Sequence, residues 1–330
     1  MTEYTYKTIL ISGGLQRANA RELQSGQWHH TARLLRIDMN NDRADVALDY
    51  VSPNDACPDE LPGIRFTAMH RHGDKIYLPT GTEVLVLDAA TLKQVDYITH
   101  PLFNDVHHVN VIDGKIHVVS TGLDSIFIID PDDHSKMEQR YIGLTPFNER
   151  FNIDTDYRKI NSTMPHESHP NFVFKMAGKT WATRLNQHDV VCLDDPTQSI
   201  RISETPIHDG ITVGDKIYFT AVNARIIIFN PSKMAVEEII DLNDLDTRKS
   251  PKGWCRGLYI DGDIAYVGLS ALRNTKFKEK IKWAVNKVTS DSIFSLPTRI
   301  AVYDLKARKL LKEYVFENQQ QDAIFSILSV

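Results

Sequence analysis

Cysteine is scarce in this sequence. Only Cys57, Cys192 and Cys255 occur among the 330 residues, they lie far apart, and none belongs to a C-x-x-C pair. An odd number of widely spaced cysteines excludes a disulfide scaffold and favours free thiols in a reducing compartment. Hydrophobic residues make up 42% of the chain, which is ordinary for a globular protein that buries its own core.

A surplus of basic residues and a long apolar run are both missing. Lys plus Arg number 38 and Asp plus Glu number 43, so the formal net charge is −5. Proteins whose main partner is nucleic acid usually carry a basic surplus. No stretch reaches the roughly 18 apolar residues of a membrane span, and the opening MTEYTYKTILISGG lacks the pattern of a signal peptide. We therefore expect a cytoplasmic protein that binds neither nucleic acid nor a membrane.

What the sequence does contain is a repeated hairpin. Five segments share a Gly-containing turn followed by alternating apolar residues, and such turns between β-rich runs are typical of tight hairpins. They are HGDKIYL (72–78), IDGKIHV (112–118), MAGKTWA (176–182), VGDKIYF (213–219) and IDGDIAY (260–266).

A second hairpin accompanies each turn of this kind. It consists of an apolar strand that ends in Asp or Asn, a short polar turn and another strand. Six segments have this form, namely 33–51, 83–98, 125–142, 189–202, 225–240 and 299–316. The repeating unit is therefore four strands, and a repeat of this length indicates a propeller or a related array.

The two ends of the chain complete the count. Residues 6–13 form a second strand without a first, and residues 322–328 form a first strand without a second. Pairing of these segments closes the ring without an open edge. The sequence predicts an all-β, six-bladed β-propeller of four-stranded antiparallel blades, in one domain (1–330), with the first blade closed by the C-terminal strand. The best helix candidate is 276–288.

Three connections between strands are long. They are residues 14–32, 144–168 and 271–298, and in a propeller all three fall on the same face. Long loops in compact folds are often lids or binding loops. The alternative is that insertions gather on a tolerant face.

Polar residues recur where the innermost strands begin. Eight residues before the aligned turn positions stand Thr67, His107, Asn171, His208 and Cys255, and the next positions hold Ala68, His108, Phe172, Asp209 and Arg256. His169 lies two residues before Asn171 and can join this ring. Neighbouring blades therefore present imidazole, amide, carboxylate and guanidinium groups at one level of the channel.

Two interpretations of the ring are open. In one, His107, His169 and His208 bind a divalent metal (Zn, Mn or Fe) and leave a position for water or substrate. Without a metal, His107 or His208 acts as a general base, with Asp209 and Arg256 handling charge. In the other, the histidines simply line a polar, water-filled channel.

Further residues are candidates for substrate binding. His108 and Asn171 belong to the ring, His30 lies in the first insertion, and Arg273 enters the last one. His29, His166 and Glu167 are weaker candidates, and Cys255 is more plausibly a buried, inert thiol than a nucleophile.

The C-terminal part of the chain resembles a family of uncharacterised bacterial six-bladed propellers. Residues 267–330 run from the strand V-G-L-S-A-L-R through an insertion and a Leu-Pro to R-I-A-V-Y-D-L, and then to A-I-F-S. Ser326 stands where that family usually has Asp. The resemblance implies the propeller fold and carries no settled activity.

A more distant similarity involves residues 207–231. This segment, IHDGITVGDKIYFTAVNARIIIFNP, is similar to the repeat of the senescence marker protein, gluconolactonase and strictosidine synthase group. Those are six-bladed propellers with the site at the channel mouth, and the hydrolases among them use Glu, Asn and Asp as metal ligands. His208 and Asp209 replace the Asn-Gly of that repeat, which favours a softer metal or none.

Together these features indicate a propeller that acts on a small molecule at the channel mouth. We expect a hydrolase or lyase for a polar metabolite such as a sugar derivative or lactone. The alternative is a ligand-binding or protein-interaction propeller without catalysis, with a protein partner on its loops.

Overall fold

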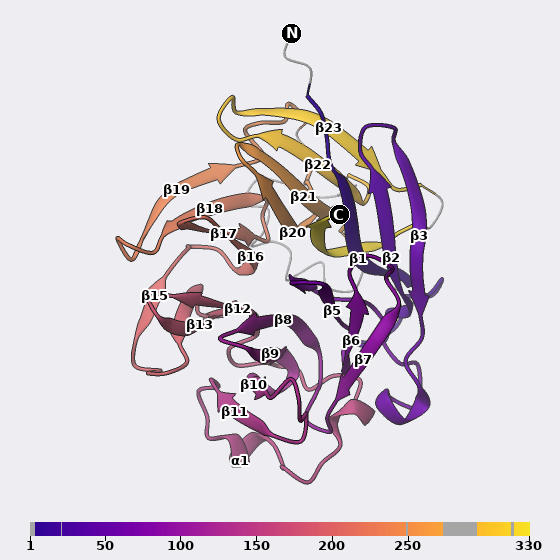
Figure 1. Cartoon of the computed structure of the whole chain (residues 1–330), viewed down its shortest axis with the longest axis vertical. Coiled ribbons are helices and arrows are strands. Elements are labelled where there is room, and N and C mark those ends of the chain that lie inside the picture. Colours follow the sequence, from indigo (N-terminus) through magenta and orange to yellow (C-terminus); the bar gives the residue numbers. More distant parts are fainter. Residues whose placement is uncertain (1–3, 21, 249, 273–295, 318–319) are drawn as a thin grey trace.

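Sheets dominate the molecule (Figure 1). The computed structural model describes residues 4–20, 22–248, 250–272, 296–317 and 320–330. Within these ranges six four-stranded antiparallel sheets surround a central axis as the blades of a propeller. The predicted six-bladed all-β fold is therefore confirmed. Among the helices of the described ranges, none has the length and apolar character needed to cross a membrane.

Each blade runs from an innermost strand beside the channel to an outermost strand at the rim. Blade 1 contains β24 (Ala323–Ser329), β1 (Thr8–Gln16), β2 (His29–Asp38) and β3 (Arg43–Tyr50); blade 2 contains β4 (His70–His72), β5 (Lys75–Pro79), β6 (Glu83–Asp88) and β7 (Gln94–Thr99); and blade 3 contains β8 (Val106–Ile112), β9 (Lys115–Ser120), β10 (Ser125–Ile129) and β11 (Met137–Tyr141).

The second half of the ring repeats this order. Blade 4 contains β12 (Pro170–Met176), β13 (Lys179–Arg184), β14 (Asp189–Cys192) and β15 (Ser199–Arg201); blade 5 contains β16 (Ile207–Val213), β17 (Lys216–Ala221), β18 (Arg225–Asn230) and β19 (Ala235–Asp241); and blade 6 contains β20 (Trp254–Asp261), β21 (Ile264–Ser270), β22 (Arg299–Asp304) and β23 (Lys309–Val315). The short helices are η1 (Asn54–Ala56), η2 (Thr121–Leu123), α1 (Phe147–Arg150) and η3 (Tyr157–Lys159).

Tight turns join the two inner strands of blades 2 to 6, as the repeat predicts. Gly73 (φ 61°) and Gly214 (φ 59°) occupy two of them. This left-handed region of φ is open to glycine at little cost, which is why glycine recurs at the turns. All five predicted inner hairpins form.

The first blade is closed by the two ends of the described chain. β24 pairs antiparallel with β1, from Ile9 opposite Ser329 to Gly14 opposite Ala323. The hydroxyl oxygens of Ser12 and Ser326 lie 2.9 Å apart in a buried hydrogen bond. The predicted closure by the C-terminal strand is therefore confirmed.

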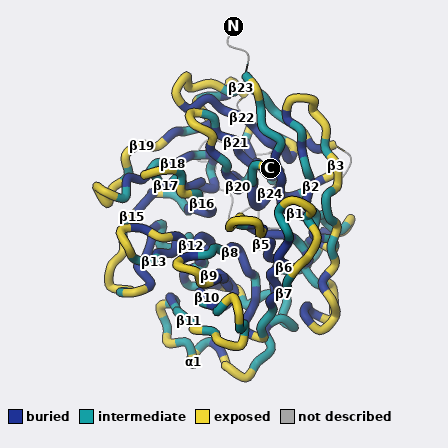
Figure 2. The backbone as a smooth tube through the Cα atoms, viewed as in Figure 1, coloured by how far each residue is buried: buried dark blue, intermediate teal, exposed yellow. Residues whose placement is uncertain are grey.

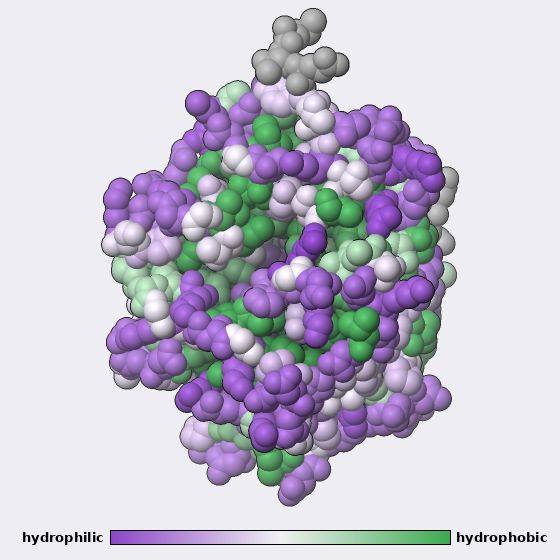
Figure 3. Space-filling view, viewed as in Figure 1, coloured by the Kyte–Doolittle hydropathy of each residue, from purple (hydrophilic) through white to green (hydrophobic). Residues whose placement is uncertain are grey.

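The core lies between the blades. Six clusters of buried hydrophobic residues each combine side chains from two neighbouring blades. Figure 2 shows mostly buried residues along the inner strands, and exposed ones at the rim and in turns, including a turn beside β5 near the middle of the view. In the space-filling view the rim is largely hydrophilic, and hydrophobic residues show closer to the middle of that face (Figure 3). Burial between blades therefore holds the innermost strands beside the channel.

The long connections differ in part from expectation. The first is shorter than 14–32 and spans only residues 17–28, because β1 and β2 continue into the predicted insertion. The second, residues 142–169, contains α1 and η3. Of the third, 271–298, most lies outside the described residues, including the candidate helix 276–288 and Arg273.

A fourth long connection, residues 51–69 between blades 1 and 2, was not anticipated. It contacts the other loops at several points, including an ion pair between Lys159 and Asp59. The Arg17 guanidinium donates to the carbonyl oxygen of Pro62 at 3.0 Å, and the Asn161 amide donates to that of Glu60 at 2.9 Å. Connections from blades 1, 2 and 3 are therefore tied together beside the channel mouth.

Candidate functional site

Irregularities in the innermost strands shape the site. The pairing shifts by a residue around His107 in β8, around His208 and Asp209 in β16, at Gly257 in β20 and at Phe325 in β24. Such bulges bend a strand and re-aim the side chains beside them. Because they recur at one level of several blades, they turn side chains from different blades toward the same space.

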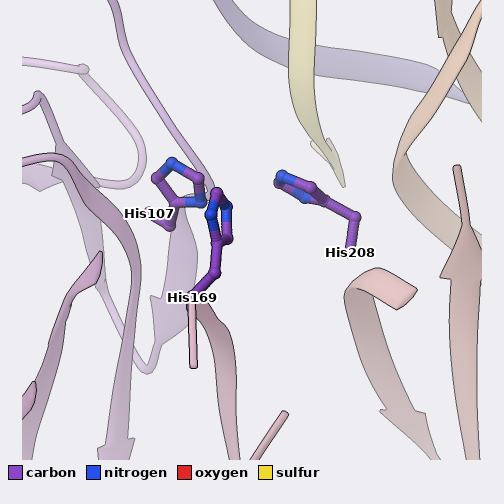
Figure 4. Close-up of side chains that lie close together, drawn as sticks. All are labelled: His107, His169 and His208. Carbon is purple, nitrogen blue, oxygen red and sulfur yellow. The ribbon is translucent and has the colours of Figure 1, made fainter. Parts of the chain in front are cut away.

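Three histidines from three blades meet there (Figure 4). His107 is the second residue of β8, His169 directly precedes β12, and His208 lies in β16. Their rings point toward one another. The ring centroid of His107 lies 5.0 Å from that of His169 and 5.2 Å from that of His208. One nitrogen of each ring lies within 4.8 Å of the others. The structure therefore brings together the three residues predicted as metal ligands.

Each of these rings has a polar neighbour at one nitrogen. Nε2 of His107 lies 3.3 Å from Oδ1 of Asp105, and Nδ1 of His169 lies 3.2 Å from Nδ1 of His166. For the third ring, Nδ1 of His208 lies 3.2 Å from Oδ2 of Asp209, although the angle is not that of a hydrogen bond.

The opposite nitrogens have no such neighbour. Within the described residues, buried Nδ1 of His107, Nε2 of His169 and Nε2 of His208 lack a hydrogen-bond partner. Buried polar atoms are nearly always paired in proteins, so unpaired ones call for a specific explanation. Burial lowers the pKa of all three imidazoles, so they are neutral at pH 7 and offer lone pairs.

Asp105 and Arg65 support His107 from behind. Their side chains form an ion pair, and Asp105 lies in the loop that leads into β8. Burial alone raises the pKa of Asp105, but His107 and Arg65 beside it hold that pKa well below its usual range. A permanently charged carboxylate therefore faces one nitrogen of His107 and fixes the orientation of the ring.

The turn that presents His169 is organised by Asp124. The Asp124 carboxylate accepts backbone N–H groups of Glu167 (2.9 Å), Ser168 (2.9 Å) and His169 (2.8 Å), and it pairs with Arg150 at 2.6 Å. His169 itself has a φ of 53°, which is uncommon for a side chain of its size. The buried carboxylate therefore holds this backbone in a conformation it would otherwise avoid.

A cavity of about 350 Å³ opens beside the three histidines. Arg65, Asp105 and Arg256 contribute its polar wall, and many of the other lining residues are apolar. The guanidinium of Arg256 lies 4.9 Å from the Phe325 ring centre. The predicted residues His107, His169, His208 and Arg256 thus share one cavity with a mainly apolar wall.

His108 and Asp209 face a different space. Both line a second cavity of about 260 Å³, which Arg71 of blade 2 also lines. Nδ1 of His108 accepts the Val173 N–H at 3.2 Å, and the carboxylate of Asp209 accepts the Gly257 N–H at 3.2 Å. Burial raises the pKa of Asp209 to about 6. Asp209 therefore lies behind His208, outside the cavity of the three histidines.

Other candidate residues lie away from both cavities. Asn171 is fully buried, where it donates to the Ile207 carbonyl oxygen and accepts from the Thr183 hydroxyl. His30 is exposed on β2, while its neighbour His29 lines the larger cavity, since successive residues of a strand face opposite sides.

Cys255 and Glu167 are neighbours of other candidate residues in the sequence. Cys255 is fully buried and burial raises its thiol pKa, which fits an inert group. Glu167 points its carboxylate at the backbone N–H groups of Leu144 and Thr145.

The sequence reading missed Arg65, Asp105 and Phe325. Arg65 and Asp105 each lie two residues before a ring position, which is also the offset of His169 from Asn171. Applying that offset to every blade would have found both residues. Phe325 has no such signal, because the bulge in β24 that turns it toward the cavity is not visible in the sequence pattern.

Fold and site together define a six-bladed propeller with a histidine cluster beside a cavity in its channel. No family model and no curated protein matches the sequence. Among solved structures, a protein of unknown function from Bacteroides caccae is 9% identical, with 98% of each chain covered and a TM-score of 0.60. A chain from the nidogen/laminin complex is 10% identical, with 97% of each chain covered and a TM-score of 0.57. At these identities the similarity concerns the fold alone.

Proposed function

We propose that His107, His169 and His208 bind one divalent metal ion and that the protein acts on a small molecule in the adjoining cavity as a hydrolase or lyase. The observation that carries this proposal is the set of buried ring nitrogens without a partner, one on each histidine. Three protein ligands with one open position is the arrangement of catalytic zinc sites.

The chemistry of the donor set supports this proposal. Neutral imidazole is a ligand for zinc, manganese and iron, and each ring has a polar neighbour at its other nitrogen, as metal-binding histidines usually do. One nitrogen of each ring lies within 4.8 Å of the others, whereas tetrahedral zinc places its ligands about 3.3 Å apart. We therefore expect the rings to move inward when the ion binds.

The residues of the chain have distinct roles in this proposal. A bound metal would polarise a carbonyl group or activate a water molecule. Asp105 holds the His107 ring in place, and Arg256 binds negative charge on the substrate. The apolar part of the cavity wall excludes water, which strengthens these electrostatic interactions.

A metal titration tests the proposal. Protein stripped with EDTA and returned to buffer is titrated with Zn²⁺ and Mn²⁺ by calorimetry, and the metal content is measured by elemental analysis. We expect about one ion per chain for the unaltered protein, and affinity roughly 100-fold weaker in His107→Ala and His208→Ala, because each loses a ligand.

His72→Ala is the matched control, since His72 is exposed on blade 2 and its loss should leave metal affinity unchanged. Absence of metal binding, or equal affinity in His107→Ala, His208→Ala and the control, would contradict the proposal. That result would favour the alternative of a non-catalytic binding or interaction propeller.

A further inference from the structure

Arg256 is a cationic side chain without an anionic partner. Within the described residues its guanidinium makes no ion pair and no hydrogen bond, and its Nε is buried. Its neighbours are aromatic: the guanidinium carbon lies 4.9 Å from the Phe325 ring centre and 5.6 Å from that of Trp254. Burial lowers the pKa of Arg256 to about 10, so the group remains charged at neutral pH.

The other charged groups of the same cavity are already satisfied. Arg65 pairs with Asp105, and the Asp322 carboxylate accepts the backbone N–H of Gln16 at 2.8 Å. The carboxylates of Asp209 and Asp105 act on Arg256 only from beyond ion-pair distance, and a desolvated charge without a directly paired counter-charge is costly. Arg256 is therefore the charged group of this cavity that a ligand would neutralise.

Ser25, Asn186 and Ser270 add a few polar groups to the cavity, but most of the remaining wall is apolar and poorly suited to a sugar. Apolar side chains from several blades line it, including Trp28, Leu185, Val222, Trp254 and Phe325. Hydroxyl groups placed against such a wall would lose their hydrogen bonds to water without replacement. By comparison with a 150 Å³ cavity that holds benzene, the 350 Å³ here holds roughly a dozen non-hydrogen atoms.

We propose that the ligand of this cavity is a small carboxylate that also carries an apolar or aromatic group. Its carboxylate pairs with the planar fork of Arg256, which matches two oxygens at once, and its apolar part packs against Trp254 and Phe325. This inference rests on the proposed function, because it names the ligand of the same site. The ligand it names differs from the polar metabolite that the sequence led us to expect.

Three probes of matched size separate charge from apolar character. Metal-free protein is titrated with 3-phenylpropionate, with the neutral 3-phenylpropanamide and with D-gluconate, a polar carboxylate. Binding is measured by calorimetry and by tryptophan fluorescence, because Trp28 and Trp254 line the cavity. We expect 3-phenylpropionate to bind about tenfold more tightly than either other probe, because charge-assisted hydrogen bonds and apolar burial then act together.

Substitution of Arg256 tests whether this side chain causes the preference for the acid over the amide. Arg256→Met keeps the length of the side chain and removes its charge, so the preference for the acid over the amide should disappear. Arg71→Met is the matched control, because Arg71 is an exposed arginine that lines the other cavity, and it should keep the full preference. The comparison of acid and amide on the unaltered protein tests the proposal even if Arg256→Met does not fold.

The results of these titrations test the carboxylate assignment independently of the proposed metal site. Equal affinity for acid and amide, tighter binding of gluconate, or an unchanged preference in Arg256→Met would overturn the carboxylate assignment while leaving the metal titration untouched. A carboxylate preference in a protein that binds no metal would support the assignment and remove the proposed metal chemistry.

Discussion

Two polar clusters of this molecule, each with buried groups, differ in how their groups are paired. One is the histidine cluster of His107, His169 and His208. The other is an ionic network on blade 6 and the connection before it, made of Asp246, Arg248, Lys252, Arg299 and Glu313. In the network every charge has a partner of opposite sign, whereas each histidine buries a nitrogen without a partner.

The network has the properties of a structural support. Lys252 Nζ lies 3.0 Å from Asp246 Oδ2, and Arg248 lies 2.6 Å from the same oxygen. Arg299, with no side-chain exposure, bonds Glu313 at 2.7 Å and the Lys252 carbonyl oxygen at 2.9 Å. The comparison teaches that burial alone does not mark a functional site. Single unpaired buried atoms occur elsewhere too, including Nη2 of Arg299 in the network. What distinguishes the histidine cluster is that unpaired nitrogens from three blades border one cavity.

The largest expected effect comes from breaking the network. Asp246→Ala leaves the Lys252 ammonium, whose side chain is 1% exposed, without its carboxylate partner. We expect the free energy of unfolding to fall by about 3–5 kcal/mol, as for other broken buried ion pairs. Urea denaturation followed by circular dichroism measures this change.

The matched control is Glu204→Ala, which removes an exposed ion pair with Arg201. It should change the free energy of unfolding by less than about 1 kcal/mol. Similar losses in Asp246→Ala and Glu204→Ala would show that the network does not stabilise the fold.

Lowering the pH should also weaken the ionic network, with a smaller loss of stability than Asp246→Ala causes. Burial by itself raises the pKa of Asp246, but the bonds from Arg248 and Lys252 outweigh it and hold that pKa well below its usual range. A depressed folded-state pKa adds stability that is present above the unfolded pKa of about 4 and is lost as the pH falls below it.

Between pH 7 and pH 3 the unaltered protein should therefore lose more stability than Asp246→Asn, by about 1–2 kcal/mol. The difference between the two urea midpoints at each pH measures this. Parallel pH profiles for the two proteins would contradict the assignment.

The smallest effect is expected in the histidine cluster without metal. His208→Ala removes a ring whose nitrogens have no hydrogen-bond partner in the described residues, so no bond is broken, and the ring borders an existing cavity. We expect a loss of less than about 1 kcal/mol in metal-free buffer. A loss as large as that of Asp246→Ala would make the cluster a structural element and remove the contrast between the two regions.

The fold could be predicted because its signals are local. Gly-containing turns such as those at Gly73 and Gly214 and the alternation of apolar residues between them specify each hairpin over a few residues. The closure of β24 on β1 followed from counting unpaired strands, which needs no knowledge of side-chain contacts.

The site could be predicted only in part, because its geometry depends on the bulges. A regular strand would place His107 and His108 on opposite faces and nothing more. The bulge in β8 decides which of them meets His208, and the bulge in β24 brings Phe325 beside Arg256. The alternation of residues along a strand does not show where a bulge occurs, so Phe325 could not be identified from the sequence.

The closing strand β24 has a consequence for biosynthesis. It follows every other described strand along the chain, yet it supplies the innermost strand of blade 1 and the Phe325 wall of the cavity. Five blades can therefore form during translation while the first waits for its partner. Chains interrupted before β24 would carry the three histidines but lack the Phe325 wall, so the cavity is complete only in molecules whose ring has closed.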